Sequence, residues 1–408
     1  METLKKVADR HGLTCLLHEK PFAGVNGSGK HNNWSLTTDD GINLLNPGAS
    51  PHDNVQFLLV LACILKAVDV HADLLRESAS DVGNDSRLGG NEAPPAIISV
   101  FLGDQLEDVI SQLCDTGEAT HSKQGGTLKT GVAMLPDLDQ DVTDRNRTSP
   151  FAFTNNKFEF RMVGSSDSVS PANVVLNTIV AEAFKEAADE LEKADDFQLA
   201  VHDMIKKLLT EHRRIIFNGN GYSKSWVKEA ARRGLPNISC MVEAIPALTT
   251  EKAVKLFETF HVYTKAELES RAEVEYDSYA KIVHIEALAM TNIAGKQIIP
   301  AIIRYTARLA DSMAKVQSVC PEAEISVQRD LLLEASRRLS EIKAAHSKLV
   351  ELQDECKSIR SAKERAIACR ERLVPAMEEL RRPVDLLERI VDKDLWPMPS
   401  YGDLLFEV

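Results

Sequence analysis

The sequence predicts an α+β fold, in which short strands alternate with helices before a mainly helical C-terminal half that ends in a helical hairpin. Two observations predict this division. Most of the 20 glycines precede residue 195, in loops between short apolar runs. After residue 195, apolar residues recur with the 3.6-residue period of amphipathic helices. We therefore expect three parts, over residues 1–195, 196–320 and 321–408.

Within the first part, apolar patterns alternate with loops rich in glycine and polar residues. Helices are predicted from the 3.6-residue apolar period at residues 1–11, 55–78 and 171–192. Short apolar runs predict strands at residues 13–18 and 34–38, and two more within 151–163. The segment 97–113 is predicted to be a strand that runs into a helix. The polar or glycine-rich stretches are predicted to be loops, at residues 24–33, 80–96 and 116–144.

The last part carries a heptad seam. Its members are spaced three and four residues apart, and are Leu332, Ala335, Leu339, Ile342, His346, Leu349, Gln353 and Cys356. Residues 321–392 contain 29 charged side chains among 72 positions, which indicates solvated helices with one buried stripe. A second run, 362–380, is predicted to fold back as an antiparallel partner, and Pro375 is expected to kink it. Such a hairpin is typical of a structural or assembly element.

Charge and cysteine content exclude several classes of protein. The 48 basic and 61 acidic residues give a net charge of −13, which argues against general nucleic-acid binding. The seven cysteines are odd in number and form no C-x-x-C pair, so a zinc site and a disulfide framework both fit poorly. The longest apolar run, 57–64, is far shorter than the roughly 20 residues of a membrane span. We expect a cytoplasmic protein with neither nucleic-acid nor membrane partners.

The segment G-V-N-G-S-G-K-H at residues 24–31 nearly matches the P-loop pattern G-x-x-x-x-G-K-[ST]. His31 stands where a P-loop needs a metal-binding hydroxyl, and residues 32–35 lack the pattern of a phosphate-cradling helix. A P-loop is therefore disfavoured. The glycines instead allow the backbone to approach a small ligand, with Asn26 as a polar contact. His31 lies in a polar loop and is a candidate metal ligand or catalytic residue.

The glycine- and proline-rich stretch 80–96 carries an arginine and a carboxylate five residues apart, Arg87 and Glu92. Its functional interpretation is a mobile flap that presents the carboxylate, with the arginine binding an anionic substrate. The alternative is a surface turn with a solvated ion pair.

A third segment combines alternating charges with nearby arginines. Lys157, Glu159 and Arg161 alternate with two phenylalanines, so the three charged side chains share one face of a strand. With Arg145 and Arg147 upstream, this cluster suits a triphosphate with a metal. A salt-bridged sheet surface explains the alternation equally well.

Taken in order, these segments resemble the signatures of the glutamine synthetase family. Residues 18–36 are similar to its K-P-x-x-G-x-N-G-S-G-x-H signature, and residues 87–94 to its flap. Residues 146–148 and 159–161 resemble its later arginine and E-x-R motifs. The exact residues of four segments are typical of the type III subfamily. These segments are H-E-K-P-F-A-G-V-N-G-S-G-K-H-N-N-W-S, G-N-E-A-P-P-A-I, D-R-N-R-T-S-P-F-A-F-T and L-W-P-M-P. The resemblance extends over the whole chain.

The resemblance implies that residues 1–195 are the C-terminal part of a catalytic domain, with an incomplete antiparallel sheet of the family's half-barrel. Type III enzymes are longer, and this sequence starts just before the glycine-loop signature. We therefore interpret it as the C-terminal portion of such an enzyme, without the β-grasp domain and the first metal-binding glutamates. On this interpretation the chain alone is expected to be inactive. Family active sites form between subunits in rings, so a ring homo-oligomer is expected of the full-length form.

The implied activity is ATP-dependent ligation of ammonia to glutamate through a γ-glutamyl phosphate, with Mg²⁺ or Mn²⁺. By motif position, the metal ligands are His31 and Glu159, and the glutamate contacts are Asn26, Gly27, Arg87 and Arg161. The residues implied to face ATP are Asn33, Ser35 and Lys157, while Arg147 faces the transferred phosphate and Glu92 accepts the ammonium proton.

Two positions depart from the family pattern, and two alternatives stay open. The usual second arginine falls on Ala152, and Lys157 replaces an arginine, which keeps the charge but loses the bidentate fork. The first alternative is a catalytically inactive remnant with an assembly or regulatory role. The second is a related ATP-dependent ligase that acts on another amine, such as a polyamine.

Overall fold

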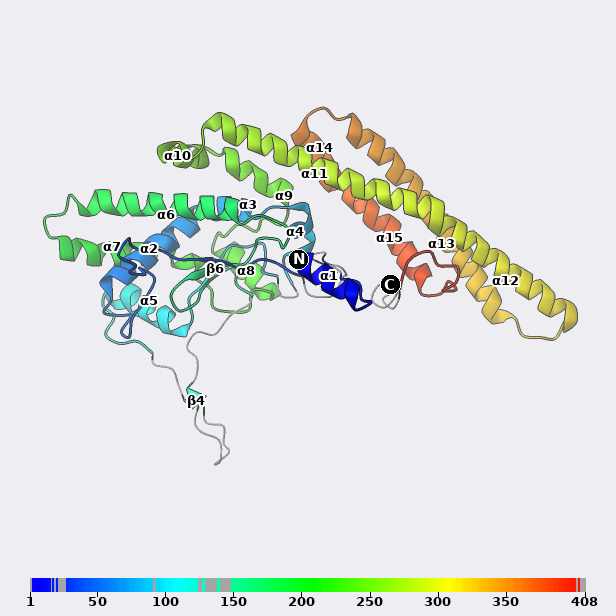
Figure 1. Ribbon diagram of the computed structural model, residues 1–408, viewed down its shortest axis with the longest axis horizontal. Helices are drawn as coiled ribbons and strands as arrows, with labels where there is room; N and C mark the ends of the chain where they lie inside the picture. Colours follow the sequence, from blue (N-terminus) through cyan, green and yellow to red (C-terminus); the bar gives the residue numbers. More distant parts are fainter. Residues whose placement is uncertain are drawn as a thin grey trace. The chain divides into compact units, whose positions relative to one another are not determined.

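The computed structural model describes residues 2–15, 17, 20, 27–90, 93–123, 127–128, 138–139, 148–400 and 403. The chain divides into two compact units, residues 18–272 and residues 1–17 with 273–408 (Figure 1). The described residues are mostly helical and include a small mixed sheet, so the predicted α+β class is confirmed.

The unit of residues 18–272 contains all the described strands. They are β1 (Asn32–Trp34), β2 (Val100–Phe101), β3 (Thr127–Leu128), β4 (Leu138–Asp139), β5 (Phe151–Phe153) and β6 (Phe158–Phe160). Its α-helices are α2 (Val55–Val70), α3 (Ala72–Glu77), α4 (Val82–Arg87), α5 (Asp104–Thr116), α6 (Ser170–Leu191), α7 (Phe197–His212), α8 (Lys224–Arg232), α9 (Met241–Ala244) and α10 (Glu251–Thr259). Two 3₁₀-helices, η1 (Arg213–Ile215) and η2 (Ile245–Thr249), connect them.

The main sheet has four strands in the order β1-β6-β5-β2. Strands β1 and β5 both pair antiparallel with β6, as expected, whereas β2 pairs parallel with β5. The parallel pairing is possible because the long connection between β2 and β5, which includes α5, returns the chain to the same end of the sheet. The sheet is therefore mixed, and the half-barrel implied by the resemblance stays a prediction.

The apolar face of this sheet packs on α2. Phe151, Phe158 and Phe160 are fully buried, and the rings of Phe151 and Phe158 stack with centroids 4.5 Å apart. Phe153 reaches Phe57 of α2, with ring centroids 5.9 Å apart. Helix α2 in turn packs against α6 and α7, which explains why its sequence is apolar on nearly every side.

The second unit is built from long helices (Figure 1). They are α1 (Glu2–Arg10), α11 (Lys265–Ile293, which begins in the first unit), α12 (Ile299–Val319), α13 (Ser326–Ser358), α14 (Ala362–Ala368) and α15 (Val374–Glu388). Helix α13 packs against α12 on one side and α15 on the other. The predicted hairpin is confirmed as the antiparallel pair of α13 with the α14–α15 segment.

The heptad seam is confirmed in α13. Ala335, Ile342, Leu349 and Cys356 are buried, and the polar Gln353 is buried with them. His346 is half-buried, and its Nε2 lies 3.1 Å from the carbonyl oxygen of Thr291 in α11. The seam is therefore a buried stripe that includes polar members, as the sequence predicted.

Two π-helical turns interrupt the long helices, each just before a proline. They are η3 (Ala294–Ile298), followed by Pro300, and η4 (Cys369–Leu373), followed by Pro375. In each, the residue before the proline donates its N–H to the carbonyl five residues back. A wider turn moves the carbonyls that a proline ring would otherwise strike. The predicted interruption at Pro375 thus takes the form of a π turn from which the helix continues.

Several boundary predictions were wrong. The predicted loop 80–96 contains helix α4, and the predicted loop 116–144 contains strands β3 and β4. The described residues of the segment 13–18 form no strand, and the next strand covers Asn32–Trp34 instead of 34–38. The single helix predicted at 55–78 is divided into α2 and α3 at His71, whose φ of −113° is not helical. This break turns the buried His71 imidazole toward α6, where Nε2 lies 2.6 Å from Oε2 of Glu182.

Candidate functional site

One face of the β1–β6 strand pair carries six of the residues predicted to bind ligands. Asn33 lies directly opposite Glu159 in the antiparallel register, and side chains two positions apart share a face. The same face therefore includes both flanking residues of each strand. Its members are His31, Asn33 and Ser35 from the first segment and Lys157, Glu159 and Arg161 from the second.

The opposite face of β1 is anchored to helix α6. The buried Asn32 donates its side-chain N–H to Oδ1 of Asn173 over 2.8 Å, and the indole of Trp34 donates to Oδ1 of Asn177 over 2.9 Å. Asn173 and Asn177 are one helical turn apart, so together they fix the strand's rotation. This anchoring leaves His31, between the loop and the strand, on the accessible face.

His31, Glu159 and Arg161 form the charged centre of this face. Oε2 of Glu159 accepts hydrogen bonds from Nε and Nη2 of Arg161, at 3.2 and 3.0 Å. Nδ1 of His31 lies 3.5 Å from the same oxygen. Partial burial and the positive charge of Arg161 lower the pKa of His31, although Glu159 opposes the shift. The lowered pKa favours the neutral imidazole, which is the form that ligates metals.

Arg87 lies at the end of α4 and is almost fully buried. Its Nη1 donates to the carbonyl oxygen of Met162 over 3.0 Å and to Oδ1 of Asn84. Its Nη2 donates to the carbonyl oxygen of Arg161 over 3.1 Å. Asn84, itself fully buried, also donates to the carbonyl of Met162. Arg87 and Asn84 thus hold the backbone that directly follows β6.

Gly29 fits against the guanidinium of Arg87. A Cβ at this position would lie 2.0 Å from Nη2 and 2.6 Å from Cζ of Arg87. Gly29 also bridges to Gly164, and the backbone N–H of Lys30 donates to the carbonyl oxygen of Val163 over 2.9 Å. The glycine loop is therefore fastened to the segment after β6, and a side chain at Gly29 would displace Arg87.

Of the residues predicted to face ATP, Ser35 and Lys157 lie at the other end of the strand pair, and Asn33 lies opposite Glu159 in its middle. Ser35 contacts the amide oxygen of Asn43 and the carbonyl oxygen of Asn156, at 3.1 and 3.4 Å. Asn33 is exposed and Lys157 is half-buried. Both side chains therefore present polar groups to the surface of this face.

Four further residues were predicted to belong to the site. Gly27 is half-buried in the loop before Gly29. Asn26, Glu92 and Arg147 lie outside the described residues. In contrast, the sequence interpretation missed Asn84. Its only local signal is its position three residues before Arg87, one turn away on a short helix.

The described part of the chain contains no group of three or more His, Cys, Asp or Glu side chains placed to hold a metal ion. Nor do the helices described there include one that combines the length and apolar character of a membrane span.

Comparisons with known proteins agree on one family. The family model described as the glutamine synthetase catalytic domain matches residues 1–70, and that of the glutamine synthetase C-terminal domain matches residues 200–317. The type-3 glutamine synthetase of Dictyostelium discoideum is 43% identical over 413 positions, which cover 100% of this chain and 56% of that protein. Glutamine synthetases of Butyrivibrio fibrisolvens and Bacteroides fragilis (strain YCH46) are 40% and 39% identical, again over the whole chain, and 58% and 57% of their own lengths are covered. The chain thus spans little more than half the length of these relatives.

Proposed function

The chain belongs to the glutamine synthetase family, and from this premise we propose that it contributes the glutamate and phosphate side of an ATP-dependent glutamate–ammonia ligase site. The supporting observation is the shared face of β1 and β6, where His31, Glu159 and Arg161 converge. The proposed place of action is the cytoplasm, and the proposed assembly is a ring of identical subunits.

The reaction that we propose has two steps. The γ-carboxylate of glutamate attacks the γ-phosphorus of ATP, which releases ADP and forms γ-glutamyl phosphate. Ammonia then attacks the acyl carbon, phosphate leaves, and glutamine forms after loss of a proton. The first step concentrates negative charge, so it needs cationic side chains at fixed positions. The second needs a proton acceptor and protection from water.

We assign the cationic roles to Arg161, Lys157 and Arg147. Arg161 is buried and oriented by Glu159, so its positive charge is held in a fixed position without reorganising. Lys157 supplies a point charge at the ATP end of the same face. The role of Arg147 at the transferred phosphate is carried over from the motif alone.

The glutamate-binding role is assigned to Asn26, Gly27, Arg161 and Arg87. Arg87 is buried against backbone carbonyls, so its direct contribution is to shape the glycine loop that would surround the substrate. Glu92 is proposed to accept the ammonium proton. In a glutamine-forming protein that contains these residues, Glu92→Ala should lower kcat by about 10²–10⁴-fold while ATP affinity is retained.

A divalent metal, Mg²⁺ or Mn²⁺, would be held by His31 and Glu159. The neutral imidazole and the adjacent carboxylate oxygen fit such an ion. When bound, the ion would neutralise phosphate charge. Two side chains supply only part of the ligand set that Mg²⁺ prefers, so the remaining ligands must be water, substrate or other protein groups. We therefore propose that residues 1–408 alone do not sustain glutamine formation.

Two measurements test the proposal. Glutamine release from glutamate, ammonia and ATP by the purified 408-residue chain should be undetectable, and steady release would contradict the incomplete ligand set. Mn²⁺ binding, followed by electron paramagnetic resonance, should weaken by about tenfold or more in His31→Ala. His202→Ala, an exposed histidine on α7, is the control and should leave the affinity unchanged. Equal affinities in both variants would exclude His31 as a ligand.

A further inference from the structure

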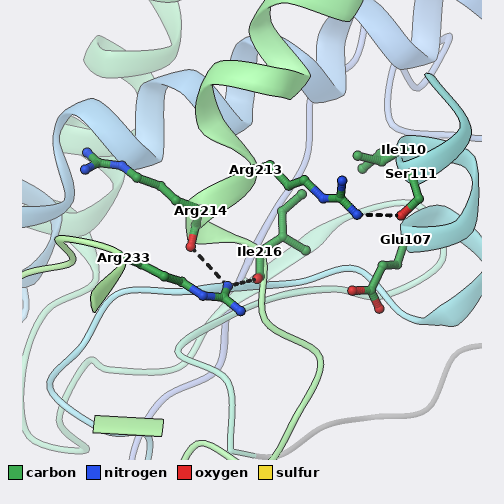
Figure 2. Close-up of a pocket in the computed structure, with 7 residues that line it drawn as sticks. All are labelled: Glu107, Ile110, Ser111, Arg213, Arg214, Ile216 and Arg233. Atoms are coloured by element: carbon green, nitrogen blue, oxygen red, sulfur yellow. Dashed lines mark hydrogen bonds between the residues drawn. The ribbon is translucent and has the colours of Figure 1, made fainter. Parts of the chain in front are cut away.

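A cavity of about 350 Å³ lies at the β2 edge of the unit formed by residues 18–272, whereas the motif residues lie on β1 and β6 at the other edge. It opens between α5 and the segment that follows α7 (Figure 2). Its lining residues come from three segments, and are Glu107, Ile110, Ser111, Arg213, Arg214, Ile216 and Arg233. The volume is that of a small-ligand site, and the lining combines four charged side chains and one hydroxyl with two isoleucines.

Arg233 is held rigidly at the wall of this cavity. Its Nε donates to Oε1 of Glu229 over 2.9 Å, and Nη1 donates to the carbonyl oxygens of Arg214 and Ile216, at 3.2 and 2.7 Å. The Arg214 side chain points out of the cavity, toward Asp69 (Figure 2). Three bonds therefore fix the plane of the Arg233 guanidinium before any ligand arrives.

The same guanidinium lies over two aromatic rings, which contact it through cation–π interactions. Its Cζ lies 5.9 Å from the ring centroid of Phe217 and 5.5 Å from that of Trp226, and these two rings stack 3.7 Å apart. The other terminal nitrogen, Nη2, has no hydrogen-bond partner among the residues that the structure describes. Figure 2 shows it on the side of Arg233 that faces Glu107. Arg233 thus offers a pre-oriented donor to the cavity.

The guanidinium of Arg213 also lines the cavity, on the side of α5. Nη2 of Arg213 donates to Oγ of Ser111 over 2.9 Å, while Nη1 is 3.5 Å from a carboxylate oxygen of the exposed Asp115. Burial lowers the pKa of Arg233, and the positive charge of Arg213 lowers it further. Arg213 thus acts on Arg233 as a like charge.

Only one lining residue carries a negative charge. Glu107, in the first turn of α5, accepts a hydrogen bond from Nδ2 of Asn218 over 2.6 Å. Its charge partly offsets the repulsion at Arg233. The lining itself thus contains more arginines than carboxylates, while Glu229 and Asp115 pair with Arg233 and Arg213 from outside it.

We propose that this cavity binds a small phosphate-bearing anion, which Arg213 and Arg233 hold together. A phosphate accepts several hydrogen bonds at once and matches the fork of a guanidinium, so it satisfies both arginines together. Ser111 supplies a hydroxyl at the same end, and Ile110 and Ile216 provide apolar contact for the rest of the ligand.

Isothermal titration with pyrophosphate at low ionic strength tests the site in the purified chain. Arg213→Gln removes an exposed charged head and should weaken binding by about tenfold or more without changing the melting temperature. Lys228→Gln removes one positive charge from an exposed site on α8 and is the matched control. No binding by the wild type at millimolar pyrophosphate, or equal losses in both variants, would overturn the proposal.

A second variant, which is expected to tighten pyrophosphate binding instead of weakening it, gives an independent test. Glu107→Gln removes the only carboxylate of the lining but keeps a side chain that Asn218 can contact. Binding of pyrophosphate should tighten by roughly threefold or more, because the repulsion between ligand and wall is lost. Weaker binding in this variant would mean that Glu107 contacts a cationic group, and would exclude a simple anion site.

Discussion

Replacing Gly29 by alanine should destabilise the unit of residues 18–272 through Arg87. The added Cβ would lie 2.0 Å from Nη2 of Arg87, so the guanidinium must move. Arg87 is only 2% exposed, and its terminal nitrogens are bonded to Asn84, Arg161 and Met162. A displaced guanidinium therefore loses about two charge-assisted bonds, each worth roughly 1.5 kcal/mol at the lower end. We expect the free energy of unfolding to fall by about 3 kcal/mol.

Denaturant unfolding followed by tryptophan fluorescence suits this measurement. Two of the three tryptophans, Trp34 and Trp226, lie in the affected unit and are buried. Gly90→Ala is the control, because nothing lies within 4 Å of a Cβ at that position. Its effect should stay within about 0.5 kcal/mol.

A double-mutant cycle separates the contact with Arg87 from effects of the loop itself. In an Arg87→Met background the guanidinium is absent, and Gly29 does not have a left-handed φ that alanine would strain. Gly29→Ala should then cost less than about 1 kcal/mol. If the full loss persisted in that background, or matched that of Gly90→Ala, the assignment of Arg87 as the obstructed group would be refuted.

Three further outcomes are expected. Glu182→Gln should lower the free energy of unfolding by about 1 kcal/mol at neutral pH, because the hydrogen bond to His71 lowers the pKa of Glu182. That stabilisation is present above pH ~4.5 and is lost as the pH falls through the lowered pKa. The melting temperatures of mutant and wild type should therefore converge in acid. Gly295→Ala would place a Cβ 3.0 Å from Nε2 of His346, and should lower the melting temperature because it disturbs a partly buried hydrogen bond to a backbone carbonyl. Deleting residues 321–408 should cause aggregation in light scattering, because it exposes the apolar face of α12; a dispersed, folded product would contradict this packing.

The strand alternation was the most informative local pattern. Lys157, Glu159 and Arg161 were predicted to share a face because side chains alternate along a strand, and the register confirms this. The same period places His31 and Asn33 on the paired strand's corresponding face. A sequence specifies such periodic features because each depends on neighbouring positions alone.

Features that depend on distant segments could not be predicted. The contact of Gly29 with Arg87 joins residues 58 positions apart, and the parallel pairing of β2 with β5 depends on the path of the chain between them. The three segments around the arginine cavity are likewise remote in sequence. Arg213 and Arg233 also lie in no local motif, so the sequence did not predict the cavity. The predicted helix boundary at His71 was wrong for the same reason, because the contact of His71 with Glu182 joins segments that are distant in sequence.

The pairing of each π turn with a following proline constrains how these helices can change length. A π turn holds one residue more than the α-helical turn it replaces, so deleting a residue from η4 would restore ordinary helical geometry. Pro375 would then meet the carbonyl that the wider turn now moves aside. The extra residue can therefore be lost only if the proline is lost as well, and the same holds for η3 and Pro300. Insertions and deletions in this unit should thus be tolerated in the loop 320–325 between α12 and α13, and rejected at both π turns.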